Sequence, residues 1–379
     1  MKKLRFSLAI LIGSAIMFSS CQKDGTTADP NVASVNFDAA YVVNGESNSI
    51  SVINLSTNKV DKTIDLPQFQ VTSGMGMMGS GGMVNMWPHH ISLSPDKSKI
   101  AVSFPGSNFN GGAGMMVSSF TSGNMMGGTS TNIPTQGKIV ILDAVSGAIL
   151  KEISLDGIAF NVAFSPDGKE LWTALMMTTG KVLVFDASTY AVLNTITVGQ
   201  FPTEVSFSDD GKKVFVANGM SNSVSVIDAV TKQVLETAAV GNYPVGAWPG
   251  MGGMMYVNNE KGQSVSMLDV MTNMMTNTVQ LGFTPGMATR NTMMNQMWVS
   301  DPNGGKVQMW TKTATGYMMG GTVTVGSGAS SIAFNQSGTT CYVTNQNDGT
   351  VSVVDVATLK EMMKITVGKK PNGIVIRNK

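Results

Sequence analysis

The sequence contains few of the residues from which catalytic and metal sites are usually built. Its 379 residues include two cysteines, Cys21 and Cys341, and two histidines, which are adjacent at His89 and His90. A Cys-x-x-Cys-His haem-attachment motif and a His-Glu-x-x-His metalloprotease motif are therefore both absent. A serine triad could use only one of these histidines, and no nucleophile-elbow sequence lies near them.

Charge is scarce as well, since only 13% of the residues are Asp, Glu, Lys or Arg. Removing the leader described below takes away three of the 25 basic residues and none of the 24 acidic ones, which leaves a net charge of −2. A chain so close to neutrality lacks the basic surface that binds nucleic acid, so we expect no nucleic acid partner. We also expect a monomer.

Sustained helical periodicity is missing, and short segments rich in β-branched and aromatic residues take its place. A tetrapeptide unit recurs seven times, starting at Tyr41, Ala101, Trp172, Phe215, Tyr256, Trp298 and Tyr342. The last four intervals between these starts are 43, 41, 42 and 44 residues. A period near 42 residues made of short strands is typical of a β-propeller with one four-stranded blade per period.

The repeated unit resembles the YVTN family of β-propeller repeats. The likeness is clearest in YVTNQNDGTVSVVDVATLK, which starts at Tyr342, and in VFVANGMSNSVSVIDAVTKQVLET, which starts at Val214. It extends over about residues 41–379 and implies an all-β, seven-bladed propeller of four-stranded antiparallel blades. It says little about function, because propellers host many unrelated activities.

The two ends of the repeat region predict how the ring closes. No inner strand precedes Tyr41, whereas the C-terminus carries an extra strand-like segment with nothing after it. We therefore predict that residues 373–377 form the inner strand of the blade that starts at Tyr41. The C-terminal strand would then close the ring and leave no open sheet edge.

The N-terminus predicts a lipid anchor. Residues 1–20 combine Lys2, Lys3 and Arg5 with an apolar run over residues 6–18, as a signal peptide does. The following Ser19-Ser20-Cys21 resembles a bacterial lipobox, although Phe18 replaces the usual Leu. The resemblance implies that Cys21 is lipidated and that residues 21–40 form a flexible tether to the outer membrane.

The residues after Cys21 indicate to which side of the outer membrane the protein could be exposed. Gln22-Lys23-Asp24 is similar to the export signal of surface lipoproteins in Bacteroidetes-type bacteria, with one acidic residue fewer. Display at the cell surface and a periplasm-facing anchor both remain open. With Cys21 acylated, Cys341 has no disulfide partner within the chain and is expected to be a buried small hydrophobic residue.

Two Met/Gly-rich insertions break the period, at about residues 70–87 and 105–137. In an up-and-down blade the chain crosses the disc once per strand, so both insertions should project from one face. The candidate ligands on that face are Met75, Met77, Met78, Met83, Met86, His89, His90, Met115, Met116, Met125 and Met126. Thioethers and imidazoles suit monovalent copper, Cu(I), so copper binding or handling is one functional hypothesis.

Three other interpretations compete with copper. The 30 methionines could reflect a bias of composition or a sink for oxidants, and the Met-rich loops could form an adaptable surface for a protein partner. A lactonase- or lyase-type enzyme would use the mouth of the central channel. The aligned residues there are His90, Asn161, Glu204, Gly246, Met287, Ser331 and Gly373, among which only His90 and Glu204 could transfer protons.

The interpretation we favour is a propeller lipoprotein that acts as a non-enzymatic binding module of the cell envelope. No catalytic residue is assigned, and its binding face would be the one that carries the two insertions.

Overall fold

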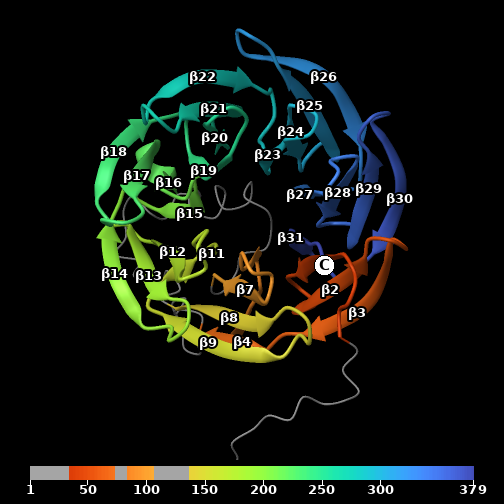
Figure 1. Cartoon of the computed structure of the whole chain (residues 1–379), viewed down its shortest axis with the longest axis horizontal. Helices are drawn as coiled ribbons and strands as arrows, with labels where there is room; N and C mark the ends of the chain where they lie inside the picture. Colours follow the sequence, from red (N-terminus) through yellow and green to blue (C-terminus); the bar gives the residue numbers. More distant parts are fainter. Residues whose placement is uncertain (1–33, 73–82, 106–135) are drawn as a thin grey trace, which may run out of the picture. The chain divides into compact units, whose positions relative to one another are not determined.

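The repeated units fold as seven four-stranded antiparallel blades around a common axis (Figure 1). The computed structural model describes residues 34–72, 83–105 and 136–379. These residues belong to one unit, Ser34–Lys379. The predicted fold class is therefore confirmed.

In each blade the strands follow one another from the central axis to the outer rim (Figure 1). Blade 1 contains β31 (Pro371–Arg377), β1 (Ala39–Asn44), β2 (Ser49–Asn54) and β3 (Lys59–Asp65). Blade 2 contains β6 (His90–Leu93), β7 (Lys99–Phe104), β8 (Gly137–Asp143) and β9 (Ile149–Leu155). Blade 3 has an inner strand in two pieces, β10 (Ile158–Ala159) and β11 (Ala163–Phe164), then β12 (Glu170–Met176), β13 (Lys181–Asp186) and β14 (Val192–Thr197). Blade 4 contains β15 (Pro202–Phe207), β16 (Lys213–Asn218), β17 (Ser223–Asp228) and β18 (Val234–Ala239).

The remaining blades follow the same order. Blade 5 contains β19 (Pro244–Pro249), β20 (Met254–Asn259), β21 (Ser264–Asp269) and β22 (Met275–Gln280). Blade 6 contains β23 (Ala288–Asn291), β24 (Gln296–Asp301), β25 (Lys306–Lys312) and β26 (Tyr317–Thr324). Blade 7 contains β27 (Ala329–Phe334), β28 (Thr340–Asn345), β29 (Thr350–Asp355) and β30 (Lys360–Thr366). A hairpin of β4 (Phe69–Thr72) and β5 (Met83–Met86) precedes blade 2, and the short 3₁₀ helix η1 (Gly219–Ser221) follows β16.

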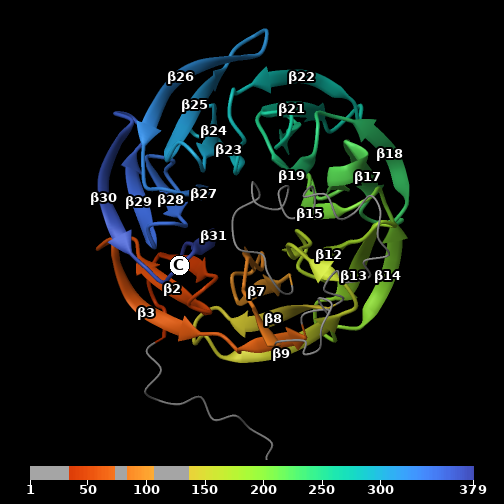
Figure 2. The same ribbon diagram turned by 180° about the vertical axis from the view of Figure 1, so that it is seen from behind.

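The C-terminal strand closes the ring as predicted. β31 pairs antiparallel with β1, with Val375 opposite Tyr41 and Arg377 opposite Ala39. It also contacts β27 and β6, the inner strands of the two neighbouring blades. Ile374 is buried, but Val375 and Ile376 are only half-buried, which is less than the full coverage that the sequence predicts. The view from behind shows the same closed circle of blades (Figure 2).

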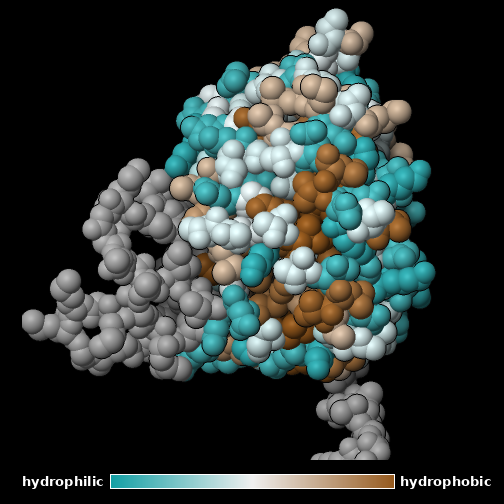
Figure 3. Space-filling model, turned by 90° about the vertical axis from the view of Figure 1, so that its left-hand side faces the viewer, coloured by the Kyte–Doolittle hydropathy of each residue, from teal (hydrophilic) through white to brown (hydrophobic). Residues whose placement is uncertain are grey.

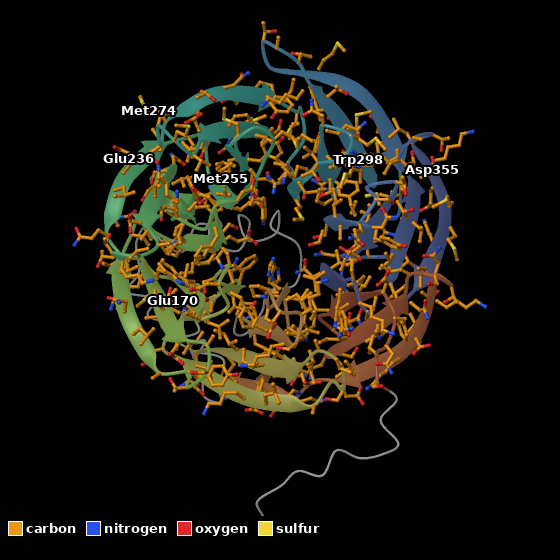
Figure 4. All side chains as sticks on the ribbon, in the orientation of Figure 1. Glu170, Glu236, Met255, Met274, Trp298 and Asp355 are labelled. Carbon is orange, nitrogen blue, oxygen red and sulfur yellow. The ribbon has the colours of Figure 1, made fainter. Side chains whose placement is uncertain are left out.

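The core lies between neighbouring blades. The aromatic residue that opens a repeat unit is fully buried in five blades, at Tyr41, Trp172, Phe215, Tyr256 and Trp298. Trp298, for example, packs edge-to-face on Phe334 of the next blade, with ring centroids 5.5 Å apart (Figure 4). Similar pairs join blade 3 to blade 4 and blade 5 to blade 6, so part of the core of each of these blades is completed by its neighbour.

Two kinds of connection meet on one face of the disc. The connections between blades bond to the turns between the second and third strands, as in Glu260 N–H to Tyr243 O (3.0 Å), Gln346 N–H to Gly328 O (3.0 Å) and Gly45 N–H to Lys370 O (2.9 Å). We call this the insertion face, because both insertions occur in connections of these two kinds. Within the described ranges, no helix is long and apolar enough to cross a membrane.

Candidate functional site

The site begins with an irregularity at the start of the inner strands. In blade 2 both His89 and His90 lie opposite Ser103, since the His89 N–H donates to Ser103 O at 2.9 Å and His90 is paired with Ser103. Register shifts occur at the corresponding place in blades 1, 4, 5 and 7. A β-bulge places two residues of the inner strand opposite one residue of the next strand, and it changes the direction of their side chains. In these five blades, two residues at the start of the inner strand can therefore face the axis instead of one.

These paired positions surround a pocket at the centre of the insertion face, which we call the channel mouth. All seven blades contribute to it. Its lining residues are His89, His90, Phe160, Glu204, Val245, Trp248, Gly286, Met287, Pro302, Ser330, Ser331, Gln346 and Asn372. The enclosed hollow is small, about 50 Å³, and it opens to solvent, so any ligand larger than a few water molecules would project from its open end.

A narrower pocket adjoins the channel mouth. It is lined by Gly45, Trp87, Pro88, His89, Gln346, Lys370 and Asn372. Three of these residues, His89, Gln346 and Asn372, also line the channel mouth. The two hollows therefore share one wall, formed by residues of blades 1, 2 and 7.

Three titratable side chains lie together in the channel mouth with most of their polar atoms unpaired. His90 Nε2 is 3.7 Å from Glu204 Oε1, and the side chains of His90 and Glu204 are 25% and 6% exposed. In the part of the chain that the structure describes, no hydrogen-bond partner is found for either ring nitrogen of His89, for Nδ1 of His90 or for Oε2 of Glu204. Buried polar atoms without partners are rare in native proteins and call for a bound water, ion or ligand.

Burial makes all three groups uncharged at neutral pH. It lowers the pKa of His89 to about 3, with a smaller contribution from His90, and it lowers the pKa of His90 to about 4. Burial raises the pKa of Glu204 to about 8. The physical cause is the same in each case, because the charged form loses its hydration in the pocket.

The neighbouring wall of the channel mouth is apolar. The indole of Trp248 lies directly over Gly246, where a side-chain Cβ would come within 2.1 Å of it. Only glycine therefore leaves room for the ring in this position. Met287 borders the same pocket, and its Sδ accepts the backbone N–H of Ile332 at 3.4 Å.

Some of the predicted channel-mouth residues line the pocket, and the others stabilise the strands around it. His90, Glu204, Met287 and Ser331 line the pocket. Asn161 instead joins blades 3 and 4, because its amide donates to Val205 O and accepts the Val205 N–H, both at 3.0 Å. Gly246 supports Trp248, and Gly373 lies close against Ile91.

The predicted copper ligands are described only in part. Cys21, Met75, Met77, Met78, Met115, Met116, Met125 and Met126 lie outside the described residues. Met83 belongs to β5, and Met86 is buried in a hydrophobic cluster with residues of blades 1 and 2. In the described ranges, no group of three or more His, Cys, Asp or Glu side chains is placed to hold a metal ion.

Sequence alignment alone missed Trp248, Pro302 and Gln346, and it missed the residue just before the aligned position in several blades. These residues include Phe160, Val245, Gly286, Ser330 and Asn372. A signal for most of them was present, because a proline stands one place earlier in five blades, at Pro88, Pro202, Pro244, Pro285 and Pro371. Aligning the inner strands on this proline brings both residues of each pair into register.

A further buried acid lies on the same face. Glu260, in the turn after β20, is 1% exposed, and neither of its carboxylate oxygens has a hydrogen-bond partner. Burial raises its pKa to about 8, while nearby Lys261 lowers it by a smaller amount. Glu260 does not line the channel mouth.

Comparison with known proteins agrees with the fold. Residues 114–233, less than half of the chain, match the model of the family described as the choice-of-anchor I domain. No curated protein matches the chain.

Solved structures match over nearly the whole chain. A functionally unknown protein from Desulfotomaculum acetoxidans has a TM-score of 0.66 at 13% identity, covering 90% of this chain and 99% of its own. The periplasmic gluconolactonase PpgL of Pseudomonas aeruginosa has a TM-score of 0.65 at 16% identity, covering 89% and 98%. Hydrazine synthase of Kuenenia stuttgartiensis has a TM-score of 0.63 at 15% identity, covering 80% and 99%. At these identities the likeness shows the fold alone.

Proposed function

We propose that this protein is a non-enzymatic binding module of the cell envelope whose ligand site is the channel mouth on the insertion face. The observation that carries the proposal is the set of unpaired buried atoms on His89, His90 and Glu204, which meet in one pocket. A ligand that pairs with these atoms would remove the cost of leaving them unsatisfied. Residues from all seven blades would then fix its position.

An anchored location is part of the proposal. The lipobox-like Ser19-Ser20-Cys21 supports a lipid anchor, and the match to a choice-of-anchor domain supports an anchored envelope protein. The tether would join the propeller to the outer membrane, with the channel mouth available to a ligand from the periplasm or from the medium. Whether the protein faces the periplasm or the cell exterior is set by export, not by the propeller.

A thermal-shift screen of small molecules and metal ions tests the binding proposal. A ligand that binds the folded state raises the melting temperature by mass action. We expect at least one compound to stabilise the wild type but not a variant carrying His89→Ala, His90→Ala and Glu204→Gln. A matched control replaces Met271 and Met274 by Ala, because these side chains are 88% and 65% exposed and lie on the opposite face.

The enzyme hypothesis makes a different prediction for the same protein. A protonated Glu204 beside His90 could act as a general acid in lactonase- or lyase-type chemistry. We expect no turnover on panels of lactones and glycosides. Turnover that disappears in Glu204→Gln would show that the channel mouth is an active site and would overturn the non-enzymatic proposal.

Copper binding is a second candidate, favoured by the ligand types in the channel mouth. His89, His90 and Met287 line one pocket, and neutral imidazole and thioether are ligands that Cu(I) accepts. Replacing Met83, His89, His90 and Met287 together should abolish binding in a titration against a competing Cu(I) chelator, with zinc binding weakly throughout. Replacing Met271, Met274 and Met275 on the opposite face should have little effect. Equal binding by the two variants would exclude a specific copper site.

A further inference from the structure

The two walls of the channel mouth differ in chemistry, and the difference restricts the ligand. Blades 2 and 4 supply His89, His90 and Glu204, which carry buried polar atoms with no hydrogen-bond partner among the described residues. Blades 5 and 6 supply Val245, Trp248 and Met287. A ligand that satisfies both walls needs several polar atoms on one side and an apolar surface on the other.

The pocket offers no counter-charge for an ionic ligand. Among the described residues that line it there is no Lys, Arg or Asp, and the acid that they include, Glu204, is 4% exposed and lies beside His90. An ion brought into such a pocket loses hydration without gaining an opposite charge, which is costly. An uncharged ligand avoids this cost.

The unpaired atoms also require a ligand that both donates and accepts hydrogen bonds. An uncharged imidazole carries one donor and one acceptor nitrogen, and a protonated carboxyl adds a donor. Hydroxyl groups fit this set, because each one donates once and accepts up to twice. A ligand with several hydroxyls could pair with His89, His90 and Glu204 at the same time.

Trp248 provides the surface for the other side of such a ligand. Its ring lies across Gly246, where any larger residue would displace it, and it remains only partly covered at the edge of the pocket. A tryptophan ring offers a large flat apolar area with little conformational freedom to lose on binding. The C–H face of a pyranose or cyclitol ring is an apolar surface of matching size.

From this geometry we infer that the ligand of the channel mouth is a small uncharged polyol that lies between Trp248 and the His89–His90–Glu204 group and projects from the open end of the pocket. The inference rests on the proposed function and names the ligand class for the same site. Ser330 and Asn372, which hydrogen-bond to each other at 3.2 Å, form the neutral polar edge beside it.

Calorimetric titration of the purified full-length protein tests this inference. The probes are glucose, galactose, mannose and myo-inositol, with glucuronate, glucosamine and choline as charged comparisons. We expect at least one neutral probe to bind, and its charged counterparts to bind more weakly by roughly tenfold or more, because they lack a counter-charge. Choline tests whether the aromatic wall instead selects a cation.

Substitutions in the apolar wall and in the polar wall test whether both walls contact the ligand. Trp248→Ala should weaken binding of the neutral probe by roughly tenfold or more, and Trp248→Phe should restore part of the loss. Glu204→Ala should cause a similar loss, which Glu204→Gln should partly recover, since an amide also donates and accepts hydrogen bonds. Met271→Ala on the opposite face serves as the control, and melting curves verify that every variant is folded.

The outcomes separate this inference from the proposed function. Binding of no neutral probe, preference for glucosamine or choline, or unchanged affinity in Trp248→Ala would overturn the polyol inference. If Cu(I) or another screened compound still binds and the channel-mouth variant abolishes that binding, the proposed function stands without it. If no compound binds in a way that depends on the channel mouth, both fail.

Discussion

At the residue scale, the asparagine that ends the repeated tetrapeptide has a structural role. In four blades the last residue of the tetrapeptide, at Asn44, Asn218, Asn259 and Asn345, donates hydrogen bonds to two hydroxyls on the next strand. For Asn259 these are Ser264 Oγ at 3.1 Å and Ser266 Oγ at 2.9 Å. The side chain also requires the preceding Gly241, where a Cβ would lie 2.5 Å from the Asn259 amide group.

We predict that Asn259→Ala destabilises the protein by about 1–3 kcal/mol, because it removes the amide that donates to two buried serine hydroxyls. Denaturant unfolding measures the change. The matched control is Asn194→Ala on the exposed outer strand β14, where we expect a change within about 0.5 kcal/mol. Equal effects at the two positions would show that the paired hydrogen bonds contribute little.

The recurrent aspartates have the structural role that the sequence indicates. Asp96, Asp167 and Asp210 each accept a hydrogen bond from a serine hydroxyl two residues earlier, within the turn. Another set caps the turns between third and fourth strands, namely Asp143, Asp186, Asp228, Asp269 and Asp355. Local bonding of this kind is readable from sequence because it depends only on near neighbours.

Glu204 gives a pH signature of the channel mouth. Its pKa rises from 4.5 to about 8 on folding, so unfolding releases a proton between these values and stability falls as pH rises through that window. His89 has the opposite pH dependence. Its pKa falls from 6.5 to about 3 on folding, so stability decreases as the pH drops below 6.5. In Glu204→Gln this titrating proton is missing. The free energy of unfolding should therefore fall less steeply between pH 4.5 and about 8, by on the order of 1 kcal/mol per pH unit.

Melting temperatures of wild type and Glu204→Gln from pH 3 to pH 9 make this comparison. Below pH 4.5 Glu204 is protonated in both the folded and the unfolded protein, so the two curves should have the same slope there. The loss of stability in that range belongs to the histidines and to the turn aspartates, such as Asp96, whose pKa is lowered by hydrogen bonds. Part of the alkaline slope should remain in the variant, because Glu260 has the same raised pKa. Parallel curves over the whole range would mean that Glu204 is ionised in the folded protein.

At the scale of the element, the inner strands show what the sequence could and could not predict. The period near 42 residues and the unpaired C-terminal segment were enough to predict seven blades and the pairing of β31 with β1. The bulge that adds His89 and its equivalents to the channel mouth was not predicted, because register depends on pairing with a distant strand. The contact of Trp248 with Gly246 likewise depends on the conformation at this strand start.

Removing β31 should unfold the propeller. The strand pairs with β1 and contacts the inner strands of blades 2 and 7, so its loss exposes the edge of β1 and opens the ring. Burial of Ile374 alone contributes about 1.5–3 kcal/mol, a large share of a net stability that is typically about 5–15 kcal/mol. Truncation after Lys370 should therefore give an unfolded or aggregated chain by circular dichroism and gel filtration. Unchanged melting would show that the C-terminal strand is dispensable for ring closure.

At the scale of the whole molecule, the apolar side chains on the outer wall suggest how to interpret the many methionines. The outer strands of blades 2, 3 and 4 start with the exposed aliphatic pairs Ile149-Leu150, Val192-Leu193 and Val234-Leu235. Blades 5, 6 and 7 have exposed methionine pairs near the start of the same strands, Met274-Met275, Met318-Met319 and Met362-Met363, and Met275 and Met319 share the register of Val234. Figure 3 shows such brown areas on the side of the disc that carries β14 and β18, and Figure 4 places Met274 at the outer rim. Methionine there replaces aliphatic residues, so its abundance at the rim is not evidence for a metal site.

The proposed lipid anchor would set the place of the channel mouth in the cell. If Cys21 is lipidated, Cys21→Ser should release the protein from the membrane fraction without changing its melting temperature, because the first described core residues, such as Val35, lie well beyond position 21. Labelling cells with a lipid precursor and fractionating them measures both the modification and the location. The variant should still bind every ligand of the channel mouth, since residue 21 lies before the propeller. A wild type that takes up no label and is recovered in the soluble fraction would exclude the lipid anchor and leave the binding proposal to stand without a membrane location.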